Sequence, residues 1–142
     1  MKIREVMTKG AEVVTPESSL ADAARKMKDL NVGMLPVCDG DTIRGTLTDR
    51  DLVIKSMAQG QNPRDAKVSA AMSEGVEWCF DDMDVGEVMG KMKKAKVRRL
   101  PVINHEKRLV GIVSLGDLAC GCGEKAAGET LEGISEPSEP QR

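Results

Sequence analysis

The motif Gly45-Thr46-Leu47-Thr48-Asp49-Arg50-Asp51 returns later in the chain as Gly111-Ile112-Val113-Ser114-Leu115-Gly116-Asp117. Each copy starts with glycine and ends with aspartate, and a hydroxyl residue stands three positions before that aspartate. Ahead of the two motifs, at similar distances, stand Leu35-Pro36-Val37 and Leu100-Pro101-Val102. Matching segments in the same order indicate an internal repeat. The chain therefore contains one structural unit twice.

Both halves of the chain predict the same order of strands and helices. Leu20, Ala23 and Met27 recur at helical spacing, and Asp39-Gly40 between two apolar runs is typical of a hairpin turn. In the first half we expect a strand at 12–15, a helix at 20–30, strands at 34–38 and 42–48, and a helix at 49–58. In the second half we expect a strand at 76–80, a helix at 84–95, strands at 99–103 and 109–114, and a helix from 115. Each βαββα unit has a bare apolar sheet face, so we predict an α/β (α+β) fold in which the units pack by pseudo-twofold symmetry.

The repeat also sets the expected domain boundaries. We place the first repeat at residues 1–60 and the second at residues 66–122, with a short linker between them. Residues 123–142 are rich in glycine, serine, glutamate and proline, which is a composition typical of disordered segments. We therefore predict a flexible C-terminal tail at 123–142.

Composition limits the partners that this protein can have. The 142 residues carry a formal net charge of -2 with both signs mixed along the chain, so no broad basic surface is expected for a nucleic-acid backbone. No apolar run reaches the length of a membrane span, and the first residues lack the apolar stretch of a secretion signal. We expect a cytoplasmic protein without a nucleic-acid or membrane partner. Aromatic residues are only 1% of the chain, which predicts an aliphatic core.

Several residues outside the motifs have side chains that can bind metals, take part in catalysis or stack on a base. The Cys120-Gly121-Cys122 segment lacks further metal ligands at suitable spacing, so we expect reduced thiols, and a metal or redox role for Cys120 and Cys122 stays open. His105 falls in a predicted polar turn and is expected to be solvated. Trp78 and Phe80 share one face of a predicted strand, where they either pack or stack on a base. No supported nucleophile, metal cluster or phosphate-binding loop of the Walker type is evident, so we expect no catalytic residue, no metal and no enzyme activity.

The glycine motif itself suggests phosphate and sugar binding. A turn from a strand into a helix presents N–H groups and the positive end of the helix dipole, which favours a phosphate. The hydroxyls of Thr48 and Ser114 can donate to phosphate oxygens, and the carboxylates of Asp51 and Asp117 can accept from both hydroxyls of a ribose. The alternative is that these residues simply cap their helices, because the same spacing is a capping box. The two roles are compatible.

Three arginines are the candidate partners for phosphate charge. Arg50 lies inside the first motif, and Arg98 and Arg99 precede the second strand of the second repeat. Each is otherwise a solvated surface residue. The second motif has Gly116 where the first has Arg50, so we expect two sites of unequal affinity.

Taken together, the motifs resemble a tandem pair of cystathionine β-synthase (CBS) domains, the arrangement called a Bateman module. The resemblance covers roughly residues 1–122. It rests on Val6-Met7-Thr8 before the first strand, on the two Leu-Pro-Val segments and on the two glycine motifs in register. The chain is also similar to small stand-alone bacterial members of this family.

The resemblance implies a regulatory sensor that binds an adenosine nucleotide (AMP, ADP or ATP) in a cleft between the two repeats. It implies the same roles for the four motif residues, and it adds Thr15, Pro36 and Pro101 on the strands that hold the base through backbone groups. It further implies a homodimer, an unidentified protein partner and no required cofactor. The competing interpretation is a dimerisation or interaction module of the CBS type whose nucleotide sites are vestigial.

Overall fold

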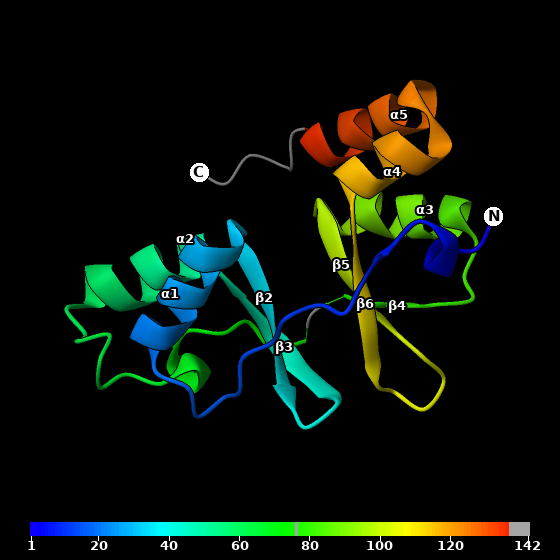
Figure 1. Ribbon diagram of the computed structural model, residues 1–142. Coiled ribbons are helices and arrows are strands. Elements are labelled where there is room, and N and C mark those ends of the chain that lie inside the picture. Colours follow the sequence, from blue (N-terminus) through cyan, green and yellow to red (C-terminus); the bar gives the residue numbers. More distant parts are fainter. Residues whose placement is uncertain (76, 137–142) are drawn as a thin grey trace. The chain divides into compact units, whose positions relative to one another are not determined.

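A two-stranded sheet and a four-stranded sheet organise the protein, and the computed structural model describes residues 1–75 and 77–136 (Figure 1). The chain divides into two compact units. We call Glu12–Val76 the first-repeat unit, and Met1–Ala11 together with Glu77–Arg142 the second-repeat unit. The mixed helix and strand content confirms the predicted α+β class. The pseudo-twofold packing of the two units stays a prediction.

The first-repeat unit is built on one hairpin and two helical segments. These are α1 (Leu20–Leu30), β2 (Met34–Asp39), β3 (Thr42–Thr48) and α2 (Asp49–Asp51), which continues through a π-helical turn (Leu52–Ser56) and a 3-10 turn (Met57–Gln59). Ser19 caps α1 by accepting the N–H of Asp22, and the apolar face of α1 is buried as its spacing predicts. The strand predicted at 12–15 is reduced to a single parallel bridge between Val14 and Val37.

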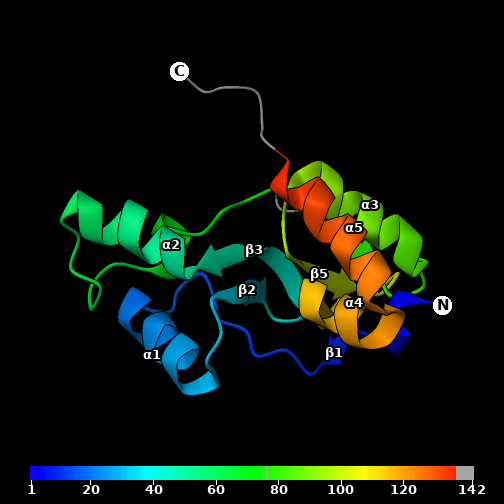
Figure 2. The ribbon, with the colours of Figure 1, turned by 90° about the horizontal axis from the view of Figure 1, so that it is seen from above.

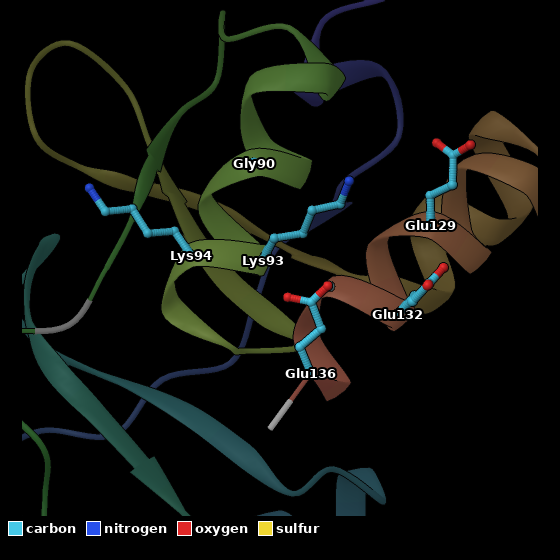
Figure 3. A pocket seen from close by; sticks show the side chains of 7 residues that line it. Gly90, Lys93, Lys94, Glu129, Glu132 and Glu136 are labelled. Carbon is cyan, nitrogen blue, oxygen red and sulfur yellow. The ribbon is translucent and has the colours of Figure 1, made fainter. Parts of the chain in front are cut away.

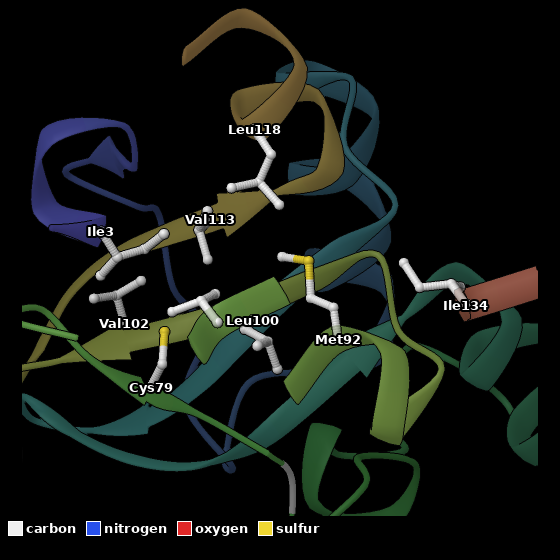
Figure 4. Packing of buried hydrophobic residues seen from close by; sticks show 9 residues of the cluster. Ile3, Cys79, Met92, Leu100, Val102, Val113, Leu118 and Ile134 are labelled. Carbon is white, nitrogen blue, oxygen red and sulfur yellow. The ribbon is translucent and has the colours of Figure 1, made fainter. Parts of the chain in front are cut away.

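The second-repeat unit contains a complete four-stranded sheet with the order β1-β6-β5-β4. Its elements are β1 (Thr8–Lys9), β4 (Cys79–Phe80), α3 (Val85–Ala95), β5 (Arg99–Ile103), β6 (Leu109–Ser114), α4 (Leu115–Cys122) and α5 (Glu124–Ser135). β5 and β6 form an antiparallel hairpin, and β4 runs parallel to β5. The buried cluster in this unit is almost wholly aliphatic, with Met92 and Leu118 facing the strands in Figure 4. The prediction of an aliphatic core is confirmed.

Each sheet is completed by a segment from the beginning of the other repeat. β1 pairs with β6, and Thr46 of β3 exchanges two backbone hydrogen bonds with Ser73, at 3.1 and 2.9 Å. The motif glycines permit this close approach. A Cβ at Gly45 would overlap the carbonyl oxygen of Ser73, and a Cβ at Gly111 would lie 2.6 Å from the carbonyl oxygen of Thr8. The compact units therefore do not coincide with the repeats at 1–60 and 66–122 that the sequence indicates.

The C-terminal region contains a helix that its composition did not predict. α5 packs against α3 and α4, and Figures 1 and 2 both show it alongside them. Ala127, Thr130 and Ile134 are buried at helical spacing, and the Thr130 hydroxyl donates to the carbonyl oxygen of Ala126 at 2.7 Å. The predicted flexible tail at 123–142 is therefore wrong for residues 124–135. Residues 137–142 lie outside the described part of the chain.

Among the helices of the described residues, none combines the length and apolar character that crossing a membrane requires.

Candidate functional site

Both glycine motifs form the same reciprocal pair of hydrogen bonds at the start of a helix. In the first repeat, the Thr48 hydroxyl accepts the N–H of Asp51 at 3.0 Å, and the Asp51 carboxylate accepts the N–H of Thr48 at 2.9 Å. In the second repeat, Ser114 and Asp117 make the equivalent bonds at 3.1 and 2.9 Å. The capping interpretation is thus confirmed at both turns. In this role each hydroxyl oxygen only accepts, so its O–H can still donate to a ligand.

The aspartate of the first repeat is paired with a cation. Asp51 is buried, and the Lys55 ammonium lies 3.3 Å from its second carboxylate oxygen. Lys55 also donates to the Ser73 hydroxyl at 3.1 Å. A ribose hydroxyl that binds Asp51 must therefore share the carboxylate with a lysine.

The carboxylate of the second repeat, Asp117, has a neutral hydroxyl as its partner instead of an ammonium group. The Thr8 hydroxyl donates to the Asp117 carboxylate, at 3.2 Å to one oxygen and 3.4 Å to the other. Gly121 stands four residues after Asp117, where the first repeat has its lysine. A Cβ at Gly121 would lie 2.5 Å from Val6, so the N-terminal segment occupies that space. The two turns therefore differ in charge although their capping geometry is the same.

A depression of about 470 Å³ lies at the start of α4 in the second-repeat unit. Arg98, Arg99 and Ser114 all line it, so three of the predicted site residues come together. Leu115, Gly116 and Ala119 of α4 line it as well, with Ala127, Gly128 and Leu131 of α5 on another side. A lining that contains two arginines and a helix start makes this a suitable place for an anion.

The remaining predicted site residues lie as follows. Pro36 and Pro101 are buried on β2 and β5, and the carbonyl oxygen of Pro36 accepts the N–H of Val14. Thr15 is exposed, and its hydroxyl lies 3.0 Å from that of Ser18. Arg50 is exposed on α2. The binding roles assigned to these residues stay predictions.

Trp78, just before β4, and Phe80, on β4, belong to a half-buried surface cluster. Their rings meet edge to face with centroids 4.9 Å apart, and Phe80 stacks on His105 at 4.3 Å. The Lys91 ammonium lies 5.1 Å from the centre of the Trp78 ring and donates to the Trp78 carbonyl oxygen. Cys79, between the two aromatic residues, points into the core. Packing within the unit is therefore one role of these rings.

His105 is exposed, as expected of a turn residue, but it has a specific partner. Its Nε2 atom lies 2.7 Å from an Asp82 carboxylate oxygen. This hydrogen bond holds the pKa of Asp82 below its usual value. Sequence spacing gave no signal for the pair, because the two residues meet through the pairing of β4 with β5.

The four cysteines are free thiols of two kinds. Burial raises the pKa of Cys38 to about 11 and that of Cys79 to about 12. Cys120 is exposed and Cys122 is half-buried on α4. Within residues 1–75 and 77–136, no group of three or more His, Cys, Asp or Glu side chains is arranged to hold a metal ion.

Comparisons with known proteins agree with this architecture. The family model of the CBS domain matches residues 3–57 and 68–120. The "Uncharacterized protein YlbB" of Bacillus subtilis is 41% identical over 138 residues, which cover 95% of this chain and 92% of that protein. "Hypoxic response protein 1" of Mycobacterium tuberculosis is 36% identical over 135 residues, 94% of each chain.

Solved structures show the same fold. A crystal structure of Hypoxic Response Protein I with two coordinated zinc ions has a TM-score of 0.79 at 35% identity, covering 85% of this chain and 98% of that one. CBSX2 in complex with AMP has a TM-score of 0.75 at 25% identity, with coverages of 85% and 95%. The CBS domain pair of protein MJ0100 in complex with 5-methylthioadenosine and S-adenosyl-L-methionine has a TM-score of 0.76 at 25% identity, with coverages of 87% and 100%. Because the family model matches twice and the relatives align over almost the whole chain, this protein belongs to the CBS domain family and carries a tandem pair of CBS domains.

Proposed function

We propose that this protein is a regulatory module that binds an adenosine nucleotide through the glycine-motif turns of its two CBS domains. The observation that carries the proposal is the duplicated turn, in which a hydroxyl and a carboxylate keep the same geometry in both repeats. One of these turns opens onto a depression with two arginines. The AMP complex of CBSX2 and the 5-methylthioadenosine and S-adenosyl-L-methionine complex of the MJ0100 pair support a ligand of the adenosine class.

Each part of the ligand has a chemical counterpart in the second repeat. Arg98 and Arg99 balance phosphate charge, and the Ser114 hydroxyl donates to a phosphate oxygen. Asp117 accepts from the ribose hydroxyls. The base is held by backbone groups near Pro101, and Thr15 and Pro36 have the same role in the first repeat. The ligand changes the shape or stability of the module, and an unidentified protein partner in the cytoplasm responds to that change.

The two sites are unequal in this proposal. A ribose hydroxyl at Asp51 competes with the Lys55 ammonium, whereas at Asp117 it competes with the neutral Thr8 hydroxyl. Displacing a charged donor from a carboxylate costs more than displacing a neutral hydroxyl, because hydrogen bonds between two charged groups are the stronger ones. We therefore assign the tighter ribose contact to the second repeat.

Calorimetric titration with AMP, ATP and S-adenosylmethionine at millimolar concentration tests the proposal. We expect heat with at least one of these ligands, and we expect the double variant Asp51→Asn, Asp117→Asn to lose it. Asparagine keeps one oxygen for the capping bond but cannot accept from two ribose hydroxyls. The control is Asp29→Asn, which makes the same charge change at an exposed position of α1. If none of the three ligands produces heat with the wild-type protein, the proposal fails.

A second candidate function is assembly, and a specific surface favours it. Val53, Ile54 and Met57, on the helical segment after Asp51, are 51%, 49% and 69% exposed. Adjacent apolar side chains of this size are typical of an interface. A homodimer through this face is expected to fall apart in the variant Ile54→Glu. Sedimentation velocity checks this, and a wild-type dimer without nucleotide binding would favour assembly as the sole function.

A further inference from the structure

Helix α5 lies outside the part of the chain that the CBS family model matches, which ends at residue 120. Its buried residues Ala127, Thr130 and Ile134 anchor it in the second-repeat unit. In the first-repeat unit, the described residues 12–75 include no α-helix after the second helical segment, only the 3-10 turn Val68–Ala70. α5 is therefore an addition to one repeat, and it introduces an asymmetry between the two turns.

α5 forms one side of the depression at the start of α4. Arg98 and Arg99 contribute two basic residues to its lining, and α5 contributes Ala127, Gly128 and Leu131. The α5 side has no donor or cationic side chain to bind an anion. A charged group pressed against these residues would lose water without gaining a partner.

The acidic residues of α5 reinforce this asymmetry. Glu129 and Glu132 line a separate depression together with Lys93 and Lys94 of α3 (Figure 3). Neither glutamate is among the residues that line the depression beside Arg98 and Arg99. Their negative charge nevertheless lies on the same helix and disfavours additional phosphate groups near it.

Gly128 marks the space that α5 leaves open. A Cβ added at Gly128 would meet no heavy atom within 4 Å, although the residue lines the depression. Gly133 on the same helix differs, because a Cβ there would lie 2.5 Å from a carbon of Lys93. Gly133 therefore lies on the packing side of α5, and Gly128 lies on the open side.

We propose that α5 limits the length of the phosphate chain that the second repeat accepts, with Gly128 and Leu131 as the residues that determine specificity. One phosphate fits beside Arg98 and Arg99, and further phosphates meet the apolar side formed by α5. The second repeat is thus selective for a nucleoside monophosphate over the diphosphate and triphosphate. This inference rests on the proposed nucleotide function.

Calorimetric titrations compare the binding of AMP, ADP and ATP to variants that all carry Asp51→Asn. This substitution removes the proposed ribose contact of the first repeat, so the measured heat reports binding to the second repeat. We expect AMP to bind at least about tenfold more tightly than ATP in this background, a ratio in the range that one pocket contact provides. Adding Gly128→Leu fills the space and should weaken AMP binding by about tenfold or more. Adding Leu131→Ala, at a side chain that is 40% exposed, removes part of the barrier and should bring the ATP affinity closer to that of AMP.

Gly90→Leu is the matched control. Gly90 is a helical glycine of α3, a Cβ there also meets nothing within 4 Å, and it lines the depression of Figure 3 instead. We expect Gly90→Leu to change the nucleotide affinities of the Asp51→Asn variant by no more than about twofold. The loss of one pocket contact changes affinity by more than that.

The outcomes separate the two proposals. If the wild-type protein binds none of the three nucleotides, the proposed function fails and this inference fails with it. If AMP binds but Gly128→Leu leaves its affinity unchanged, or if ATP binds as tightly as AMP in the Asp51→Asn background, only the role of α5 is overturned. If Gly128→Leu does not fold, an unchanged ATP-to-AMP ratio in Leu131→Ala overturns the inference.

Discussion

Replacing Asp117 by alanine tests how much the reciprocal hydrogen bonds of the turn stabilise the second-repeat unit. The carboxylate accepts the Ser114 N–H at 2.9 Å and the Thr8 hydroxyl at 3.2 Å, and both bonds are lost in the variant. A helix cap contributes about 0.5–2 kcal/mol. A hydrogen bond to a charged group contributes about 1.5–3 kcal/mol net, and less where water can replace the donor, as it can at the exposed Thr8 hydroxyl. Because Asp117 is half-buried, we expect a loss of about 1.5 kcal/mol in the free energy of unfolding.

Urea denaturation followed by far-ultraviolet circular dichroism measures this loss. For a denaturant slope of about 1.5 kcal/mol per molar urea, the midpoint should fall by about 1 M. Asp117→Asn keeps one oxygen acceptor, so its midpoint should fall by about a third of that amount. Introducing Thr8→Val into the wild type and into Asp117→Ala completes a double-mutant cycle. We expect a coupling energy of about 0.5–1 kcal/mol between Thr8 and Asp117.

Two results would refute this reasoning. A midpoint for Asp117→Ala equal to that of the exposed control Asp29→Ala would show that the capping bonds contribute nothing to stability. A coupling of zero between Thr8 and Asp117 would show that the N-terminal segment is not held by that carboxylate.

Three further variants or measurements address the packing of the chain. Gly45→Ala places a Cβ against the Ser73 carbonyl oxygen and should cost about 2–3 kcal/mol in urea denaturation, and a native midpoint would contradict the close approach. Maleimide labelling at neutral to mildly alkaline pH, read by intact mass, should modify exposed Cys120 in the folded protein but not Cys79. Burial holds the pKa of Cys79 near 12 and so suppresses its thiolate, and rapid labelling of Cys79 would contradict that burial. Ile134→Ala should lower stability by about 2–4 kcal/mol because Ile134 anchors α5, and an unchanged melting temperature would show that α5 does not pack.

Local sequence patterns predicted the elements whose signals are short-range. The helix at 20–30 and the strands at 99–103 and 109–114 have the same bounds in the structure as in the prediction. Periodic apolar residues and turn glycines carry these signals within a few positions of each other. The capping boxes belong to the same class, because their partners lie three residues apart.

Composition was a poorer guide at the C-terminal end of the chain. The glycine, serine and glutamate content of 123–142 suggested disorder, yet Ala127, Thr130 and Ile134 recur at helical spacing and are buried. The helical spacing was present in the sequence, but the average composition of residues 123–142 does not reveal it. Similarly, the strand expected at 12–15 became a single bridge, since backbone pairing depends on a partner strand and not on β-branched residues alone.

The duplicated motif was sufficient to establish the repeat, the order of elements and the family, because those follow from residues that are near each other or recur in register. It could not show that Thr8 binds the carboxylate of Asp117 while Lys55 binds that of Asp51. Nor could it show that α5 lines the depression beside Arg98 and Arg99. These contacts join segments that are distant along the chain or lie outside the repeat, so only the folding of the backbone brings their side chains within hydrogen-bonding or packing distance.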